Sequence, residues 1–210
     1  ERSHQHTAWQ CFLRTGPVAL LPLFDGSCSL VWSLDSALVP ELRDGTEASF
    51  NQRLQQACDG VLGRMALASE RRTFPLHSMT ADSYIAPRCA LVGDAAHVIH
   101  PLAGQGANLG LLDAAALCET IADGIAVRED PGAVRLLRHY EQQRRTHNLI
   151  MDRAMSALQA GFSWAPGPLA ALLGRGFGVV NRRAALKRAF ARRALGTVGE
   201  LPRLARAPLP

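Results

Sequence analysis

One stretch of the sequence, Arg88 to Asp113, combines residue types that could bind a polar ligand. Cys89–Val92 is an apolar run long enough for one buried strand, and it ends abruptly at Gly93 and Asp94. A carboxylate at the carboxyl end of a strand lies where open α/β sheets bind their ligands. Because an ionised Asp only accepts hydrogen bonds, Asp94 suits the hydroxyl groups of a sugar or a ribityl chain. The alternative is a plain turn with a capping Asp.

A glycine-rich turn follows and is expected to open a helix. Gly104 and Gly106 flank Gln105, and a helical pattern runs from there to about Ala126. Glycines allow a tight turn with close approach of the backbone. Such a turn points free N–H groups and the positive end of the helix dipole at whatever docks there. The turn is therefore predicted to face an anion or an electron-rich ring edge, although its glycines do not match the G-x-G-x-x-G dinucleotide fingerprint.

The complete string is more specific than its parts. Gly-Asp-Ala-Ala-His, then Pro-Leu-Ala-Gly-Gln-Gly-x-Asn-x-Gly and a following Asp resemble the second flavin-binding motif of the class A FAD-dependent aromatic hydroxylases. Within that class the string is most similar to the ubiquinone-biosynthesis hydroxylases. The resemblance implies FAD as the cofactor, NAD(P)H as the reductant and an electron-rich polyprenyl phenol or quinol as the substrate. The tail from Met151, which reads MDRAMSALQAGFSWAPGPLAALLGRGFGVVN and then LKRAFARRALG, is most similar to the demethoxyubiquinone hydroxylase branch.

The resemblance also implies roles for single residues. Asp94 would bond the ribityl chain, Pro101 would lie beside the isoalloxazine ring, and the N–H groups near Gly106 and Ala107 would face the pyrimidine edge of the flavin. The predicted cofactor-binding residues are Gly93, Asp94, Pro101, Gly104, Gln105, Gly106, Ala107 and Asn108. No catalytic residue is assigned, because the chemistry is mostly that of the cofactor.

Other titratable residues are expected to be structural. His97 should hold the loop by hydrogen bonds, and Asp113 should be a hydrogen-bonding partner rather than a catalyst. His100 stands beside Pro101, and assistance in proton transfer is the less favoured alternative for it. His4 is expected to be solvated. The histidines show no metal-ligand spacing such as H-E-x-x-H, so no metal is predicted.

Composition limits the compartment and the partners. The 210 residues are 48% hydrophobic, which suffices for a sizeable core, and contain no apolar run of 18 residues. Five scattered cysteines without a Cys-x-x-Cys pair indicate reduced thiols, a cytoplasmic setting and no zinc site. The net charge is +5, and nine of the basic residues follow Gly161 against a single acidic residue, Glu200.

The first part of the chain is predicted to form an antiparallel meander and a helix. Strands are expected over 6–14, 17–23 and 27–34, with the Asp25-Gly26 pair as a hairpin signal. Residues 46–59 fit an amphipathic helix whose N-cap is Thr46. Another strand is expected over 71–76. Trp9 and Trp32 are more simply core residues than the lining of a substrate cavity, which the resemblance would also allow.

Helices dominate the rest of the expected fold. One should begin at Asp130-Pro131, with Pro at the first helical position, and run to about Gln159. Its predicted core face is Leu137, Tyr140, Ile150, Met151, Met155 and Leu158. Shorter helices are expected near 168–178 and 181–195. The second of these is basic. It is either a solvated face or an interfacial helix that binds anionic lipid, and without aromatic interleaving it does not suggest nucleic-acid binding.

The predicted fold class is α/β: part of a Rossmann-like FAD-binding domain, a mixed or antiparallel substrate-domain sheet and a helical C-terminal tail. The expected domains are 1–87, in the substrate sheet, 88–160, in the FAD domain, and 161–210, the basic tail. The sequence lacks the strand, G-x-G-x-x-G turn and helix with which the family pattern opens. The chain is therefore expected to be the carboxyl-terminal half of a longer enzyme and inactive alone.

Several partners fit this interpretation. They are the inner-membrane surface, other proteins of ubiquinone biosynthesis and a second copy of the chain, because exposed strand edges and apolar faces favour oligomers. The competing interpretation is a non-catalytic module that binds lipid or protein and holds no flavin.

Overall fold

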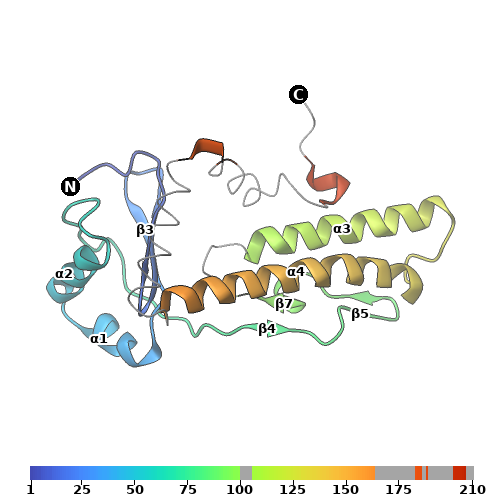
Figure 1. Ribbon diagram of the computed structural model, residues 1–210, viewed down its shortest axis with the longest axis horizontal. Helices are drawn as coiled ribbons and strands as arrows, with labels where there is room; N and C mark the ends of the chain where they lie inside the picture. The colour runs from blue at the N-terminus through green and yellow to red at the C-terminus, as the bar shows by residue number, and fades with distance from the viewer. Residues whose placement is uncertain (100–105, 164–182, 186–187, 189–200, 207–210) are drawn as a thin grey trace. The chain divides into compact units, whose positions relative to one another are not determined.

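The computed structural model describes residues 1–99, 106–163, 183–185, 188 and 201–206. They fall into two compact units, of which the first consists mostly of residues 1–75 and the second mostly of residues 76–158. Both helices and strands are present, as the predicted mixture of α and β structure requires (Figure 1). The Rossmann-like character and the functional domain boundaries stay predictions.

The first unit is built on a three-stranded antiparallel sheet. Strands β1 (Trp9–Leu13), β2 (Gly16–Pro22) and β3 (Cys28–Trp32) pair in sequence order, which is the predicted meander with slightly shorter strands. The turn between β2 and β3 closes through Asp25, whose Oδ1 accepts a hydrogen bond of 2.9 Å from the Ser27 N–H. Gly26 adopts a φ of +86°, a conformation that favours glycine.

Two helices and a short 3-10 turn follow the sheet: η1 (Ser36–Leu38), α1 (Val39–Asp44) and α2 (Glu47–Ala57). The helix predicted over 46–59 is confirmed, and so is its cap, because Thr46 Oγ1 accepts a hydrogen bond of 3.2 Å from the Ser49 N–H. The short helix α1 was not predicted, since six residues are too few for a clear periodic pattern.

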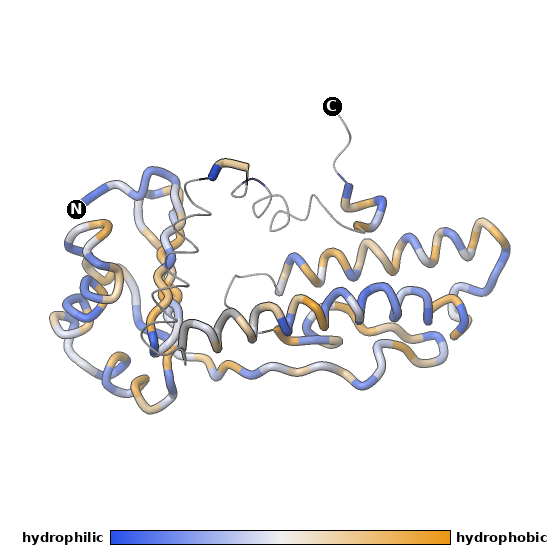
Figure 2. The backbone as a smooth tube through the Cα atoms, viewed as in Figure 1, coloured by the Kyte–Doolittle hydropathy of each residue, from blue (hydrophilic) through white to orange (hydrophobic). Residues whose placement is uncertain are grey.

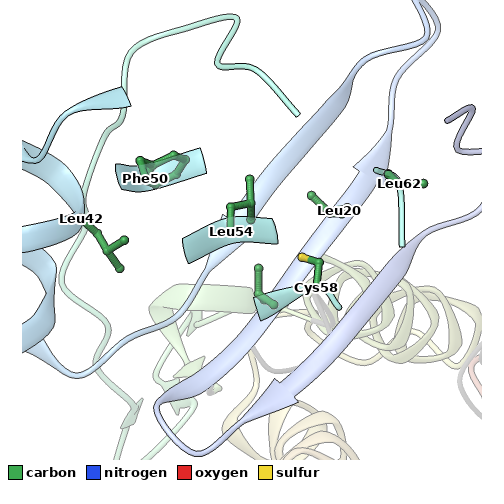
Figure 3. Packing of buried hydrophobic residues seen from close by; sticks show 7 residues of the cluster. Leu20, Leu42, Phe50, Leu54, Cys58 and Leu62 are labelled. Carbon is green, nitrogen blue, oxygen red and sulfur yellow. The ribbon is translucent and has the colours of Figure 1, made fainter. Parts of the chain in front are cut away.

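The core of the first unit is apolar, as Figure 3 shows. Its buried members are Val18, Leu20, Leu42, Phe50, Leu54, Cys58 and Leu62. Trp32 packs against this cluster with its ring centroid 6.2 Å from that of Phe50, in agreement with a core role. Trp9, in the edge strand β1, is 38% exposed. One face of α2 and one face of the sheet thus account for most of this core.

Two predictions for the first unit are wrong. Residues 71–76 do not form a strand; instead the Arg71 guanidinium donates to the carbonyls of Leu42 and Gly45, at 2.7 Å each, at the end of α1. This side chain anchors the segment, so no ladder is needed to hold it. His4 is not solvated but 5% exposed, because its Nδ1 accepts a hydrogen bond from the His6 N–H at 3.0 Å and so closes a turn.

The second unit begins with short antiparallel pairs rather than a long strand. β4 (Met79–Thr80) pairs with β7 (His97–Val98), and β5 (Ile85–Ala86) pairs with β6 (Cys89–Ala90). The strand predicted over residues 89–92 is therefore only two residues long, because β5 is its one ladder partner among the described residues. Of the two alternatives expected for the sheet, mixed or antiparallel, the described residues show the antiparallel one, because every ladder in them is antiparallel.

Helices α3 (Gly106–Ala126) and α4 (Val134–Ser163) lie side by side and run in opposite directions (Figure 1). The predicted end of α3 is confirmed. The predicted start of α4 is wrong, because Asp130 to Gly132 form a turn in which Asp130 Oδ1 accepts from the Gly132 N–H at 3.0 Å. The helix begins at Val134 and continues past Gln159 to Ser163.

The buried face of α4 is partly polar. Its described members are Leu137, Tyr140, Arg144 and Asn148, within a stretch that is hydrophilic over much of its length (Figure 2). Ile150 was predicted in the core but is 59% exposed, because the face turns through Arg144 and Asn148 instead. Met151 is half-buried, and the side chains of Met155 and Leu158 lie outside the described residues.

The C-terminal segment 201–206 lies against α3. The Leu204 N–H donates to Glu119 at 2.6 Å, and Arg203 donates to Asp123 at 2.6 Å. The helix expected over 168–178 lies outside the described residues, as does most of that over 181–195. Among the described helices, none is both long enough and apolar enough to cross a membrane.

Candidate functional site

The Gly93-Asp94 pair forms a tight turn that rests directly on α3. Gly93 begins the 3-10 turn η2 (Gly93–Ala95) with a φ of +61°, a conformation that favours glycine. A Cβ atom added to Gly110 of α3 would lie 3.2 Å from the Gly93 Cα. Backbone therefore meets backbone at this point, with no side chain between the turn and the helix.

The Asp94 carboxylate lies beside the first residue of α3. A Cβ atom on Gly106 would lie 4.0 Å from Asp94 Oδ1, and Asp94 is exposed. Within the described residues, no hydrogen bond or ion pair engages its carboxylate. The first N–H groups of an α-helix have no partner within the helix. Acceptor oxygens and donor N–H groups thus stand side by side, an arrangement that fits a ligand with both hydroxyl groups and an electron-rich edge.

The structure brings together five of the eight predicted site residues. Gly93 and Asp94 form the turn, and Gly106, Ala107 and Asn108 form the first turn of α3 beside it. Ala107 and Asn108 are exposed. The other three predicted residues, Pro101, Gly104 and Gln105, lie outside the described residues, as does His100.

The buried carboxylate of Asp113 anchors this turn by hydrogen bonds. Its Oδ2 accepts from the Gly93 N–H at 3.1 Å and lies 2.6 Å from His97 Nε2. Its Oδ1 accepts from Arg144 Nε at 2.7 Å and from Asn148 Nδ2 at 3.2 Å. Asp113 is fully buried, so these four contacts replace water entirely. The predicted structural roles of Asp113 and His97 are confirmed by these bonds.

The electrostatics of this cluster favour an ionised Asp113. Burial alone would raise its pKa, but the hydrogen bonds from His97 and Arg144 outweigh burial and lower the pKa below its ordinary value. The fully buried Arg144 guanidinium balances the carboxylate charge and also donates to Asn148 Oδ1 at 3.1 Å. Because Asp113 is ionised, His97 donates its Nε2–H to it.

Two tyrosines and a glutamate surround the anchor. The Tyr84 ring stacks on His97 at 5.9 Å between centroids, and the Tyr140 hydroxyl donates to the Leu91 carbonyl at 2.7 Å. Burial raises the pKa of Tyr140, which keeps its hydroxyl protonated as this bond requires. Glu141 accepts from the Tyr84 N–H at 2.7 Å and so ties α4 to the segment before β5.

Sequence reasoning missed Arg144, Asn148 and the tyrosine pair as neighbours of the site. A signal was present, because residues 137, 140, 144 and 148 recur at helical spacing and mark one face of α4. A search for apolar residues passes over that face where Arg and Asn interrupt it. An apolar face that continues through Arg and Asn indicates a buried acidic partner elsewhere in the chain.

Comparison with known proteins places the chain among flavoproteins. Residues 5–154 match the family described as FAD binding domain. The chain is 42% identical over 209 residues to the ubiquinone hydroxylase UbiL of Rhodospirillum rubrum, a match that covers 98% of the chain and 49% of the relative. It is 37% identical over 190 residues to 3-demethoxyubiquinol 3-hydroxylase of Escherichia coli, covering 90% of the chain and 48% of the relative. The chain thus spans about half the length of these curated relatives.

Solved structures give the same picture. The crystal structure of PqsL from Pseudomonas aeruginosa, described as a probable FAD-dependent monooxygenase, matches with a TM-score of 0.58 at 27% identity, over 74% of this chain and 44% of that one. The p-nitrophenol 4-monooxygenase PnpA from Pseudomonas putida matches with a TM-score of 0.61 over 85% of this chain and 45% of that one. At 21% identity, this second likeness speaks for the fold alone.

Proposed function

Since the chain belongs to the FAD binding domain family, among the class A flavin monooxygenases and their ubiquinone hydroxylases, we propose that it supplies part of the flavin site of a ring hydroxylase. The substrate class would be a polyprenyl phenol or quinol, with NAD(P)H as reductant. The observation that carries the proposal is the Asp94 carboxylate beside the first turn of α3, within the string that resembles the second flavin motif. The activity is proposed for the protein at its natural full length.

The described residues divide the work of holding FAD. Asp94 would accept hydrogen bonds from the ribityl hydroxyls, and the N–H groups near Gly106 and Ala107 would face the pyrimidine edge of the ring, where they favour negative charge. Gly93 and Asn108 flank these contacts, and Pro101, Gly104 and Gln105 would complete the site. FAD, when bound, supplies the oxygen chemistry, so the role of this chain is to bind and orient the cofactor.

The reaction step that we propose is hydroxylation of a demethoxyubiquinone-type ring. The similarity to the E. coli 3-demethoxyubiquinol 3-hydroxylase supports this step, as does the resemblance of the tail from Met151 to that branch. The test is to supply the full-length protein with FAD, NAD(P)H and a short-chain demethoxyubiquinol. A product heavier by one oxygen atom in mass spectrometry supports the step, and oxidation of NAD(P)H without such a product contradicts it.

The flavin contact is tested with Asp94→Ala in the full-length protein. Loss of a hydrogen bond to a charged group costs about 1.5–3 kcal/mol, which corresponds to a roughly 10- to 150-fold weaker affinity for FAD. Asp82→Ala, which removes another exposed aspartate of the second unit, is the matched control and should leave the affinity unchanged. Equal affinities of Asp94→Ala and the wild type would contradict the assigned contact. A colourless protein that binds no FAD would favour a non-catalytic module instead.

We also propose that the basic residues near 181–195 bring the protein to an anionic membrane surface, where a polyprenyl substrate resides. The partner would be the inner membrane, approached from the cytoplasm as a peripheral contact. Each basic residue near an anionic surface contributes about 1 kcal/mol, and salt weakens the attraction. Co-sedimentation with anionic vesicles at low and high salt tests this against a variant with Arg182, Arg183, Lys187 and Arg188 changed to Gln. Equal binding of both proteins would contradict it.

A further inference from the structure

The position of Asp94 depends on a carboxylate that does not reach the proposed ligand. Asp113 lies two turns into α3 and accepts the N–H of Gly93, the residue directly before Asp94. We propose that Asp113 is a positioning residue for the flavin contact of Asp94, and that Arg144 and Asn148 of α4 hold Asp113 for this task. This inference rests on the proposed function.

The hydrogen-bonding pattern makes Asp113 the anchor of the turn. Within the turn, the Ala96 N–H donates to the Gly93 carbonyl at 2.8 Å. Among the described residues, the Gly93 N–H makes the one hydrogen bond between η2 and the helices. That N–H defines the plane of the peptide that leads into Gly93. With the φ of Gly93 at +61°, the backbone then delivers Asp94 toward Gly106. Loss of the anchor would leave the turn resting on Gly110 without a fixed orientation.

The two oxygens of Asp113 face different elements. Oδ2 holds the turn side, Gly93 and His97, whereas Oδ1 holds the α4 side, Arg144 and Asn148. The carboxylate therefore transmits the placement of α4 to the turn. Asp113 and the Gly93-Asp94 turn stand between Arg144 and the ligand, which makes Arg144 a supporting residue and not a ligand-binding one.

Asp113→Asn tests the bridging role with little change in shape. An Asn side chain has a single acceptor oxygen, so it can satisfy either Gly93 or Arg144 but not both. A general loss of stability would weaken FAD binding in any background. A positioning role predicts instead that the effect of Asp113→Asn depends on the presence of the Asp94 carboxylate, which a double-mutant cycle measures.

The cycle consists of the full-length wild type, Asp113→Asn, Asp94→Ala and the double variant, each titrated with FAD. We expect Asp113→Asn to raise the Kd about tenfold when Asp94 is present and less than about twofold when it is replaced by Ala. Glu141→Gln is the control, because Glu141 also ties α4 to another segment, the one before β5, through the Tyr84 N–H, but it makes no hydrogen bond to η2. Its Kd should stay within about twofold of the wild type in both backgrounds.

Each outcome decides the matter. An equal effect of Asp113→Asn in both backgrounds, or none in either, overturns the positioning role while a strong Asp94→Ala effect leaves the proposed function intact. An Asp94→Ala variant with wild-type affinity overturns the proposed contact itself and the positioning role with it. If Asp113→Asn does not fold, Asn148→Ala, which removes one donor to Oδ1, goes through the same cycle with an expected coupling of about threefold. Absence of coupling there also overturns the role.

Discussion

The core cluster of the first unit is apolar, whereas the second unit buries an ion pair in addition to its own apolar cluster. In the first, Leu20, Phe50 and Leu54 form an apolar core between one helix and one sheet face (Figure 3). In the second, the fully buried Asp113 and Arg144 are paired between α3 and α4. An apolar core adapts to substitutions of similar volume, whereas a buried ion pair depends on both partners and on each hydrogen bond. The candidate flavin site belongs to the unit with the less adaptable centre.

The largest expected effect comes from breaking the polar centre. Asp113→Ala would leave the Arg144 charge buried without a partner, which costs about 3–5 kcal/mol of stability toward unfolding. Urea denaturation followed by circular dichroism measures this loss. The double variant Asp113→Ala with Arg144→Met is the control, because it removes the unpaired charge and should recover part of the loss. A loss below about 1 kcal/mol in the single variant would show that the pair is not buried as described.

The apolar centre should respond somewhat less. Leu54→Ala removes a buried side chain from the core of the first unit and should cost about 3 kcal/mol, as lost burial and a cavity together. Leu54→Met, which nearly conserves the volume, should cost less than about 1.5 kcal/mol. Thermal unfolding gives both values. If Leu54→Met were as damaging as Leu54→Ala, the first unit would not have the adaptable core that distinguishes it from the second.

A smaller effect is expected from acid. In the folded protein the pKa of Asp113 lies below its ordinary value of 3.8. The ionised carboxylate therefore contributes its full stabilisation at any pH above 3.8. This contribution is lost as the pH falls from 3.8 through the lower folded pKa. The Asp113→Asn variant should lose less stability over that range than the wild type, in parallel urea titrations at each pH. Identical pH dependence of the two proteins would contradict a lowered pKa for Asp113.

The smallest effect is expected at a helix end in the first unit. Thr46→Ala removes the N-cap of α2, because Thr46 Oγ1 accepts a hydrogen bond from the Ser49 N–H. The substitution should lower the free energy of unfolding by about 1 kcal/mol. Thr46→Ser keeps the hydroxyl and serves as the control. A difference between the two variants in urea midpoint measures the cap alone, and no difference would contradict its contribution.

The same contrast explains what the sequence could reveal. The meander, the capped helix α2 and the end of α3 follow from local patterns, namely β-rich runs, Thr46 before an amphipathic stretch, and a continuous helical segment. Gly93, Asp94 and Gly106 could be proposed as a site because they stand within one short string. The grouping of Asp113 with Arg144 and Asn148 joins residues 31 and 35 positions apart, and no local pattern encodes such a pairing.

The wrong predictions of a strand over 71–76 and of a helix start at Asp130-Pro131 also have local physical causes. Residues 71–76 have strand-forming composition, but the Arg71 guanidinium binds the carbonyls at the end of α1 and holds the segment without a ladder. Pro131 favours a helix start at that position. However, the carboxylate and the carbonyl of Asp130 accept hydrogen bonds from the Gly132 and Ala133 N–H groups and form a turn instead. In both cases hydrogen bonds from a side chain to the backbone hold the segment in a conformation other than the strand or helix that backbone propensity favours.

The contact between Gly93 and Gly110 limits how this protein can change over generations. Enlarging a residue at a tight contact is normally tolerated when its neighbour becomes smaller. Here a Cβ atom on Gly110 would approach the Gly93 Cα to 3.2 Å, and Gly93 itself has a φ of +61°. Both residues are already the smallest that exist, so no second substitution can compensate for the first. Variants at either position are therefore expected to disappear singly rather than to drift as pairs.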